Sequence, residues 1–151
     1  MAGSLDFIPG PGPRTLDLGA WGEIGVQVCY EIVFSGQVVD REHRPDFIFN
    51  DSNDGWFGPS GPPQHLAQAR LRAAEEGLPV LRATPTGISA VIDARGNVVK
   101  ELGWRKAGAI DFVMPPAANA PPLFARFGNS IPLLLGFALM FAGIVLGVRR
   151  R

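Results

Sequence analysis

A run of eighteen uncharged residues at positions 131–148, IPLLLGFALMFAGIVLGV, restricts the fold of this chain more than any other feature. As a helix it would extend about 27 Å, close to the roughly 30 Å of hydrocarbon in a bilayer. Pro132 suits a first turn, and the run holds three glycines, which are commoner in membrane helices than in soluble ones. The run predicts a transmembrane helix, with the core helix of a soluble protein as the alternative.

Three arginines at positions 149–151 follow the run directly and predict its orientation. Basic residues flank the cytoplasmic ends of membrane helices, so we expect a cytoplasmic C-terminus and a preceding domain on the far side. Residues 1–6 have neither the basic nor the apolar region of a signal peptide. A domain outside the membrane needs an upstream element for its export. We therefore expect this chain to be the C-terminal part of a longer membrane protein.

Charge and composition exclude several classes of protein. Residues 1–148 contain eleven basic and fourteen acidic side chains, and this net charge of −3 excludes nucleic-acid binding driven by charge. Hydrophobic residues at 46% exclude intrinsic disorder, and 19 glycines with 14 prolines exclude an all-helical bundle. The single cysteine, Cys29, excludes an intramolecular disulfide and a multi-cysteine zinc site. We expect no metal or cofactor.

Residues 1–122 combine predicted strands with one helix. Short apolar runs predict strands at 24–29, 45–50, 79–83 and 107–114, and a hairpin over 88–100 with a glycine in its turn. Residues 64–76 carry an apolar stripe at helical spacing that stops before Gly77. The proline- and glycine-rich residues 7–13 predict a loop. This order predicts an α/β domain with a mixed sheet, and residues 123–151 form the approach to the membrane, the helix and the basic tail.

Cys29 stands where the first predicted strand ends and is followed by Tyr30 and Glu31. A turn at this point would expose the sulfur, and the next backbone N–H would be available to stabilise an oxyanion. A thiol becomes a useful nucleophile only where a nearby cation or base favours its thiolate. The residue type alone leaves open the alternative of a small buried hydrophobic side chain.

A second dense group of polar and aromatic residues spans 50–58, NDSNDGWFG. It predicts a loop that lines a cleft; the alternative is a turn capped by its own Asn and Asp side chains, with Trp56 in the core. His65 begins the predicted helix, where we expect it to cap or pack rather than act as a base. Arg82 and the hydroxyls after it either face an anion or belong to a plain strand and turn.

Taken in order, these segments resemble the apolipoprotein N-acyltransferase family, a membrane-embedded branch of the carbon–nitrogen hydrolase (nitrilase) superfamily. They are residues 28–34 (VCYEIVF), 53–58 (NDGWFG), 64–73 (QHLAQARLRA), 81–84 (LRAT) and 86–93 (TGISAVID), with 125–129 (ARFGN) leading into the apolar run. The resemblance begins near Phe7 and reaches the end of the chain. The cysteine motif marks the superfamily, and its combination with a terminal span marks the acyltransferase branch.

The resemblance implies part of an α-β-β-α sandwich on the periplasmic side of the bacterial inner membrane, with its active site facing the membrane. It implies an enzyme of lipoprotein maturation, in which Cys29 takes an acyl chain from a phospholipid as a thioester. The acyl chain then passes to the N-terminal diacylglyceryl-cysteine of an apolipoprotein. Tyr30 would offer its backbone N–H and Glu31 would support the cysteine, while Trp56 and Phe57 would line the lipid-facing pocket.

The sequence departs from the family in its charged catalytic residues. Family members use a glutamate base and a lysine that lie upstream of the matched region, and neither Lys100 nor Lys106 lies in the lysine motif. The missing N-terminal part of the same enzyme is therefore an expected partner, and the chain alone is expected to be inactive. The alternatives are an amidase acting on a small amide, against which the apolar run argues, and a non-catalytic fragment.

Overall fold

One six-stranded mixed sheet organises the chain in the computed structural model, which describes residues 10–149. Its strands follow chain order across the sheet: β1 (Thr15–Asp17), β2 (Glu23–Val28), β3 (Phe47–Asp51), β4 (Val80–Ala83), β5 (Ser89–Ile92) and β6 (Val98–Leu102). β2, β3 and β4 are parallel, whereas β1, β5 and β6 pair antiparallel to their neighbours. The predicted mixed sheet is confirmed, and the three single strands at 24–29, 45–50 and 79–83 and both strands of the hairpin lie within two residues of the observed ones.

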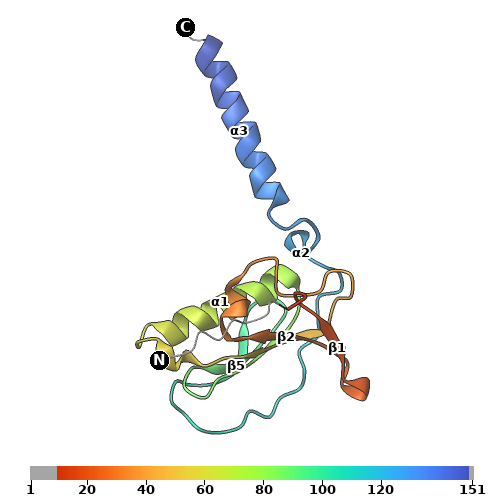
Figure 1. The fold of residues 1–151 in the computed structure, drawn as a ribbon, viewed down its shortest axis with the longest axis vertical. Coiled ribbons are helices and arrows are strands. Elements are labelled where there is room, and N and C mark those ends of the chain that lie inside the picture. Colours follow the sequence, from red (N-terminus) through yellow and green to blue (C-terminus); the bar gives the residue numbers. More distant parts are fainter. Residues whose placement is uncertain (1–9, 150–151) are drawn as a thin grey trace, which may run out of the picture.

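Helix α1 (Gly61–Glu76) connects β3 to β4 and lies across one face of the sheet (Figure 1). It begins three residues before the predicted start because prolines occupy its first turn, where their fixed φ fits and no N–H is needed. It ends where predicted, because Gly77 takes the left-handed conformation at φ 66° and donates its N–H to the Ala73 carbonyl. The core lies between this helix and the sheet and includes Leu66, Ala69, Ala73, Ile48, Val80 and Ile92.

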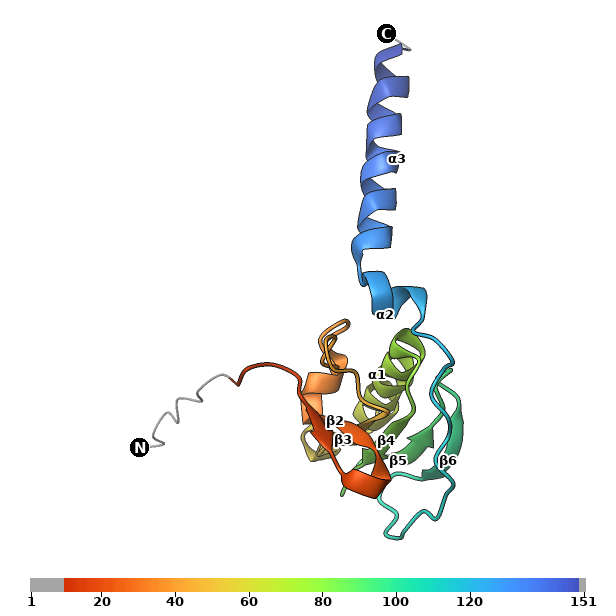
Figure 2. The same cartoon turned by 90° about the vertical axis from the view of Figure 1, so that its right-hand side faces the viewer.

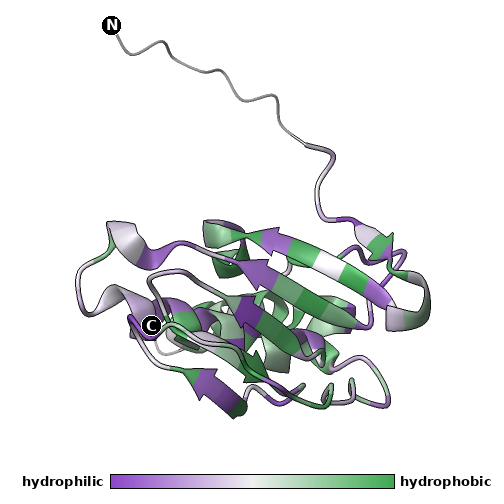
Figure 3. Cartoon of the chain, turned by 90° about the horizontal axis from the view of Figure 1, so that it is seen from below, coloured by the Kyte–Doolittle hydropathy of each residue, from purple (hydrophilic) through white to green (hydrophobic). Residues whose placement is uncertain are grey.

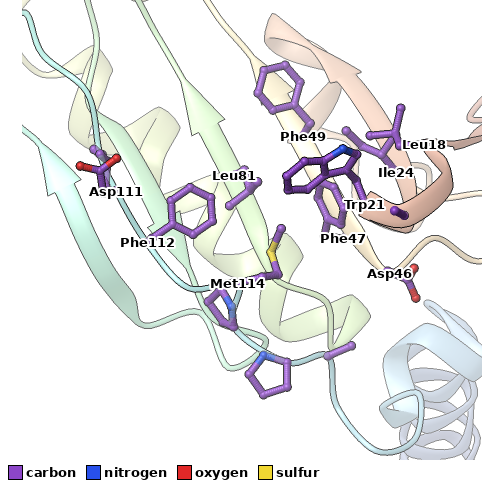
Figure 4. Close-up of a pocket in the computed structure, with 15 residues that line it drawn as sticks. Leu18, Trp21, Ile24, Asp46, Phe47, Phe49, Leu81, Asp111, Phe112 and Met114 are labelled. Atoms are coloured by element: carbon purple, nitrogen blue, oxygen red, sulfur yellow. The ribbon is translucent and has the colours of Figure 1, made fainter.

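The strand predicted for residues 107–114 is wrong, since the described stretch between β6 and residue 123 contains no strand. The segment is extended, and Ile110, Phe112 and Met114 line a cavity of about 860 Å³ against Phe49 and Leu81 (Figure 4). It crosses the second face of the sheet instead of following an edge. Alternation of apolar residues therefore predicts an extended chain, but a strand also needs a hydrogen-bonded neighbour.

The chain ends in two helices, α2 (Leu123–Phe127) and α3 (Ser130–Arg149). α2 packs against α1, while α3 stands away from the sheet and its helix (Figures 1 and 2). None of the apolar stretch Ser130–Gly147 is buried within the structure. The helix predicted over 131–148 is thus present, does not pack into the core, and is a candidate membrane span. Of the loop predicted for 7–13, residues 7–9 lie outside the described part.

Candidate active site

Cys29 occupies a tight turn directly after β2, at the first residue of the 3₁₀ helix η2 (Cys29–Val33). Its φ of 49° lies in the left-handed region, which costs a residue with a Cβ roughly 1 kcal/mol. Glu31 stabilises the turn, because its Oε2 accepts the Val28 N–H at 2.7 Å. The thiol is half-buried and unpaired. A strained residue with a side chain at a strand end is typical of a functional turn.

Three parallel strands bring their carboxyl ends to the same edge of the sheet as this turn. Gln27, Asn50 and Arg82 are neighbours in register across β2, β3 and β4, and all three side chains are buried. In Figure 3 the hydrophilic colour gathers toward the arrowheads of these strands. Ligands of open α/β sheets bind at the carboxyl ends of the strands, so this edge is the place to look for chemistry.

A buried ion network fills the space behind the turn. The Arg82 Nη2 donates to both carboxylate oxygens of Asp54, at 2.9 and 2.8 Å, and its Nη1 donates to the Asn50 Oδ1. The His65 Nδ1 lies 2.8 Å from the Asp54 Oδ1 and donates to it, because an ionised carboxylate only accepts. Asp54 belongs to the 3₁₀ helix η3 (Asp54–Trp56), so the network joins η3, α1, β3 and β4.

Charge and burial act in opposite directions on this network. Burial by itself raises the pKa of the Asp54 carboxyl, but the His65 hydrogen bond and the charge of Arg82 outweigh it and hold that pKa below 3.8. Burial lowers the pKa of Arg82, against the opposing negative charges of Asp54 and of an ionised Cys29. The guanidinium is therefore held in the buried network chiefly as the partner of Asp54.

The network contacts Cys29 through three side chains. The His65 Nε2 lies 3.2 Å from the Cys29 carbonyl oxygen, and the Asn50 Nδ2 donates to the same oxygen at 3.3 Å. The Ser52 Oγ lies 3.7 Å from the Cys29 Sγ and also contacts Asp54 and His65. The backbone of Cys29 is thus held from the buried side, while its sulfur faces the loop after β3.

Aromatic side chains surround the open side of the turn unevenly. Tyr30, Phe57 and His65 line a pocket of about 180 Å³, and the Phe57 ring meets the His65 ring edge-on with centroids 6.1 Å apart. Trp56 is 85% exposed, so its alternative role in core packing is wrong. Tyr30 and Phe57 therefore share one pocket, Cys29 and Glu31 lie in the turn next to Tyr30, and the Trp56 side chain is exposed to solvent.

Two sequence interpretations are revised by this geometry. His65 does not cap α1, because it is the fifth residue of the helix; it packs as expected, edge-on against Phe57, and in addition it bonds the carboxylate of Asp54. Arg82 does not present its charge to an external anion, because it is 3% exposed and bound to Asp54 and Asn50. The expected turn capping is found at Asn53 alone, whose Oδ1 accepts the Gly55 N–H.

Sequence reasoning missed Asn50, Ser52 and Asp54 as one functional group with His65 and Arg82. The available signal was the presence of polar residues at the ends of apolar strands and on the inner stripe of the helix. Neither lysine reaches this group: Lys100 lies in β6, at the far edge of the sheet from β2, and Lys106 lies beyond it. Within residues 10–149, no three His, Cys, Asp or Glu side chains converge to hold a metal ion.

The cavity of about 860 Å³ lies away from Cys29. Its walls include Trp21, Ile24 and Phe47 near the amino ends of β2 and β3, and the side chains converge on it in Figure 4. Its position on the sheet face opposite α1 separates it from the buried network. The strained turn with its polar network, and not the volume of this cavity, therefore identifies the candidate site.

Residues 5–114 match the carbon-nitrogen hydrolase family. The chain belongs to this family. The yeast Saccharomyces cerevisiae Nit3, a member of branch 10 of the nitrilase superfamily, superimposes with a TM-score of 0.57 at 26% identity, over 69% of this chain and 41% of that one. An amidase of the nitrilase superfamily from Nesterenkonia AN1, 21% identical, shares the fold with a TM-score of 0.54 over 67% of this chain and 42% of its own.

Within the carbon-nitrogen hydrolases, this chain is a homologue of apolipoprotein N-acyltransferases. The enzyme of that name from Bradyrhizobium diazoefficiens is 50% identical over 125 residues, which are 82% of this chain and 22% of the relative. The one from Rhodopseudomonas palustris is 42% identical over 144 residues, 95% of this chain and 26% of the relative. The chain therefore spans about a quarter of the length of the curated relatives that it matches.

Proposed function

We propose that this chain is the cysteine-bearing part of an apolipoprotein N-acyltransferase, with Cys29 as the acyl-carrying nucleophile. The observation that carries the proposal is the strained turn at Cys29, which presents a lone thiol beside a buried network of polar side chains. The homology to enzymes of that name supports the same reaction.

The proposed reaction has two halves that balance. In the first, the Cys29 thiol gives its proton to a base and the thiolate attacks an ester carbonyl of a phospholipid. A C–S bond forms, the ester C–O bond breaks, and the lysophospholipid leaves with the proton from the base. In the second, the α-amino group of a diacylglyceryl-cysteine attacks the thioester and gives a proton to the base. An amide C–N bond forms, the C–S bond breaks, and the released thiolate takes that proton back. Thiolate suits both halves because it is a good nucleophile and a good leaving group.

The neighbouring side chains have separate proposed roles. The Tyr30 backbone N–H would stabilise the oxyanion of each half-reaction, and Glu31 would keep the turn closed through its bond to Val28. Phe57, in the pocket beside Tyr30, and the exposed Trp56 would contact the acyl chain. Apolar contact at this place agrees with a lipid donor better than with the small amide of an amidase.

The proposal also includes a membrane location and a further part of the enzyme. α3 would span the bacterial inner membrane with the C-terminus in the cytoplasm and the sheet in the periplasm. The apolar sheet face around Phe49 and Leu81 would pack against the remaining layers of an α-β-β-α sandwich, residues 1–122 forming only part of it. Those layers would bring the glutamate and the lysine that the family uses.

The test fuses the chain to the upstream region of the Bradyrhizobium diazoefficiens relative, incubates the membrane-embedded protein with phospholipid and no acceptor, and measures its mass. We expect a gain of one fatty-acyl group that hydroxylamine removes and that is absent in Cys29→Ala. An adduct that persists in Cys29→Ala would contradict the proposal. Hydrolysis of a small amide without any acyl adduct would favour the amidase instead.

A further inference from the structure

The Cys29 carbonyl is bound by two side chains for which the proposed reaction has no direct use. His65 approaches this oxygen through Nε2 at 3.2 Å and Asn50 through Nδ2 at 3.3 Å. Both donors are buried, His65 at 5% and Asn50 at 0% exposure. Two buried donors converging on one carbonyl fix the orientation of the peptide group that contains it.

That peptide group links Cys29 to Tyr30. Because a trans peptide is planar, its C=O and N–H point in opposite directions. Holding the Cys29 oxygen on the buried side therefore turns the Tyr30 N–H away from the network, toward the open side of the turn. This N–H is the one that the proposed reaction uses for the oxyanion.

The left-handed conformation of Cys29 makes such a hold necessary. A residue with a side chain is strained at φ 49°, and relieving that strain requires rotation about the Cys29 N–Cα bond, which moves the Cys29 carbonyl relative to β2. The rotation would remove the carbonyl from His65 and Asn50 and would move the Tyr30 N–H out of position. The two donors thus oppose the relaxation of the turn.

The donors are themselves oriented by one ion pair. Arg82 bonds the Asn50 Oδ1 with Nη1, which directs the Asn50 amide nitrogen to two carbonyl oxygens, that of Gln27 at 3.0 Å and that of Cys29 at 3.3 Å. It bonds Asp54 with Nη2, and Asp54 accepts from the His65 Nδ1, which directs Nε2 to the same carbonyl. The His65 ring therefore has one oxygen acceptor beside each of its two nitrogens.

We propose that His65 and Asn50, oriented by Arg82 and Asp54, form a carbonyl clamp that positions the Tyr30 N–H as an oxyanion donor. The clamp residues are positioning residues, since they act through the peptide group and not on the substrate. This inference rests on the proposed acylation of Cys29 and adds to it the residues that determine the geometry of the oxyanion site.

The test compares two reactions of the same thiol in the full 151-residue chain in detergent micelles. Acylation by p-nitrophenyl acetate forms a C–S bond, releases p-nitrophenolate and passes through an oxyanion, whereas alkylation by iodoacetamide forms no oxyanion. Each rate is measured across pH, so that ionisation of the thiol is fitted separately. The ratio of the acylation rate to the alkylation rate then reports oxyanion stabilisation alone. We expect this ratio to be about tenfold higher in the folded chain than in the same chain unfolded in urea.

Two variants of His65 separate the clamp from a general structural role. His65→Asn places an amide near the position of Nδ1, where it meets Asp54 only, and we expect the ratio to fall about tenfold. His65→Gln places a donor near Nε2, within reach of the Cys29 carbonyl, and should restore most of the ratio. Circular dichroism and the alkylation rate show whether each variant is folded. Asn50→Asp, which lacks the second donor, should lower the ratio in the same way.

Several outcomes would overturn the clamp. A folded His65→Asn chain that keeps the wild-type ratio of acylation to alkylation rates would overturn it. A folded His65→Gln chain whose ratio falls as far as that of His65→Asn would also overturn it. Equal ratios in the folded and unfolded wild-type chain would overturn it without any variant. Because p-nitrophenyl acetate needs neither phospholipid nor upstream residues, a failure of phospholipid acylation leaves these rates unchanged, so the two proposals fail independently.

Discussion

Glu31 is a single residue whose contribution can be measured apart from catalysis. Its carboxylate accepts the Val28 N–H at 2.7 Å and closes the turn that carries Cys29. We expect Glu31→Ala to lower the free energy of unfolding by about 1 kcal/mol, as for the loss of a helix cap. Glu31→Gln should cost less than half of that, because its amide oxygen can still accept the N–H. Urea unfolding followed by circular dichroism measures both, and equal losses would exclude the capping role.

Gly87 lies against the buried ion pair at a distance that leaves no room for a methyl group. A Cβ built at this position would lie 2.1 Å from the Asp54 Oδ2 and 2.8 Å from the Thr84 Oγ1. Gly87→Ala must therefore displace Asp54 from Arg82, and we expect it to destabilise the chain by about 3 kcal/mol. Gly58→Ala is the matched control, because nothing lies within 4 Å of its Cβ. Equal melting temperatures for the two variants would show that Asp54 can move without loss of folding stability.

At the scale of elements, Asp54 is the point where η3, α1 and β4 are joined. Its bonds to His65 and Arg82 connect segments that are 11 and 28 residues apart in the chain. Asp54 is 1% exposed, so the loss of its charge would leave the Arg82 guanidinium buried without a counter-ion. We expect Asp54→Asn to cost about 3 kcal/mol at pH 7.

The cost of Asp54→Asn should depend on pH in a defined direction. The pKa of Asp54 is lower in the folded chain than its ordinary 3.8, so its stabilising contribution is complete above that pH. As the pH falls through the lower folded pKa, the carboxylate is protonated and the contribution is lost. The stability difference between wild type and Asp54→Asn should therefore narrow only below about pH 4. Urea unfolding from pH 2 to 7 measures it, and a constant difference would contradict the ion network.

At the scale of the whole molecule, the sheet is covered unequally on its two faces. α1 and the core occupy one face, whereas residues 110–117 only partly cover the other and leave the cavity lined by Trp21, Phe47 and Phe49. α3 then extends away from both layers (Figure 2). Its apolar side chains are exposed. An apolar sheet face and an apolar helix both need an environment other than water.

We expect α3 to cross the membrane with Arg151 in the cytoplasm. A reporter that is active only in the periplasm should be inactive when fused after Arg151, and the chain should stay with membranes during alkaline extraction. Replacing Leu139 by Arg at the middle of the span should release the chain, because a charge at the bilayer centre costs about 3 kcal/mol. The same substitution at Val113, an exposed position outside α3, is the control. Activity of the reporter would place Arg151 in the periplasm and would contradict the expected orientation.

The local sequence pattern was sufficient to predict those helices and strands whose formation depends mainly on the residues within them. The periodicity of residues 64–76, the short apolar runs and the uncharged stretch at 131–148 predict elements that the structure contains. The turn at Cys29 follows from the end of β2. These predictions succeed because backbone hydrogen bonding and burial repeat with the period of each element. The motifs also indicate the family.

Only the tertiary structure decided what depends on contacts between distant segments. Residues 107–114 have the alternation of a strand, yet they form no hydrogen-bonded ladder with the sheet, and Phe112 and Met114 lie over one of its faces. The hydroxyl residues that follow Arg82 in the sequence allow an anion-binding role. The parallel register of β3 and β4 instead places Arg82 beside Asn50, where its guanidinium bonds Asp54. His65 reaches the Cys29 carbonyl across 36 residues of sequence. Side-chain partners of this kind are set by how α1 and the strands pack together, and no periodicity in the sequence encodes them.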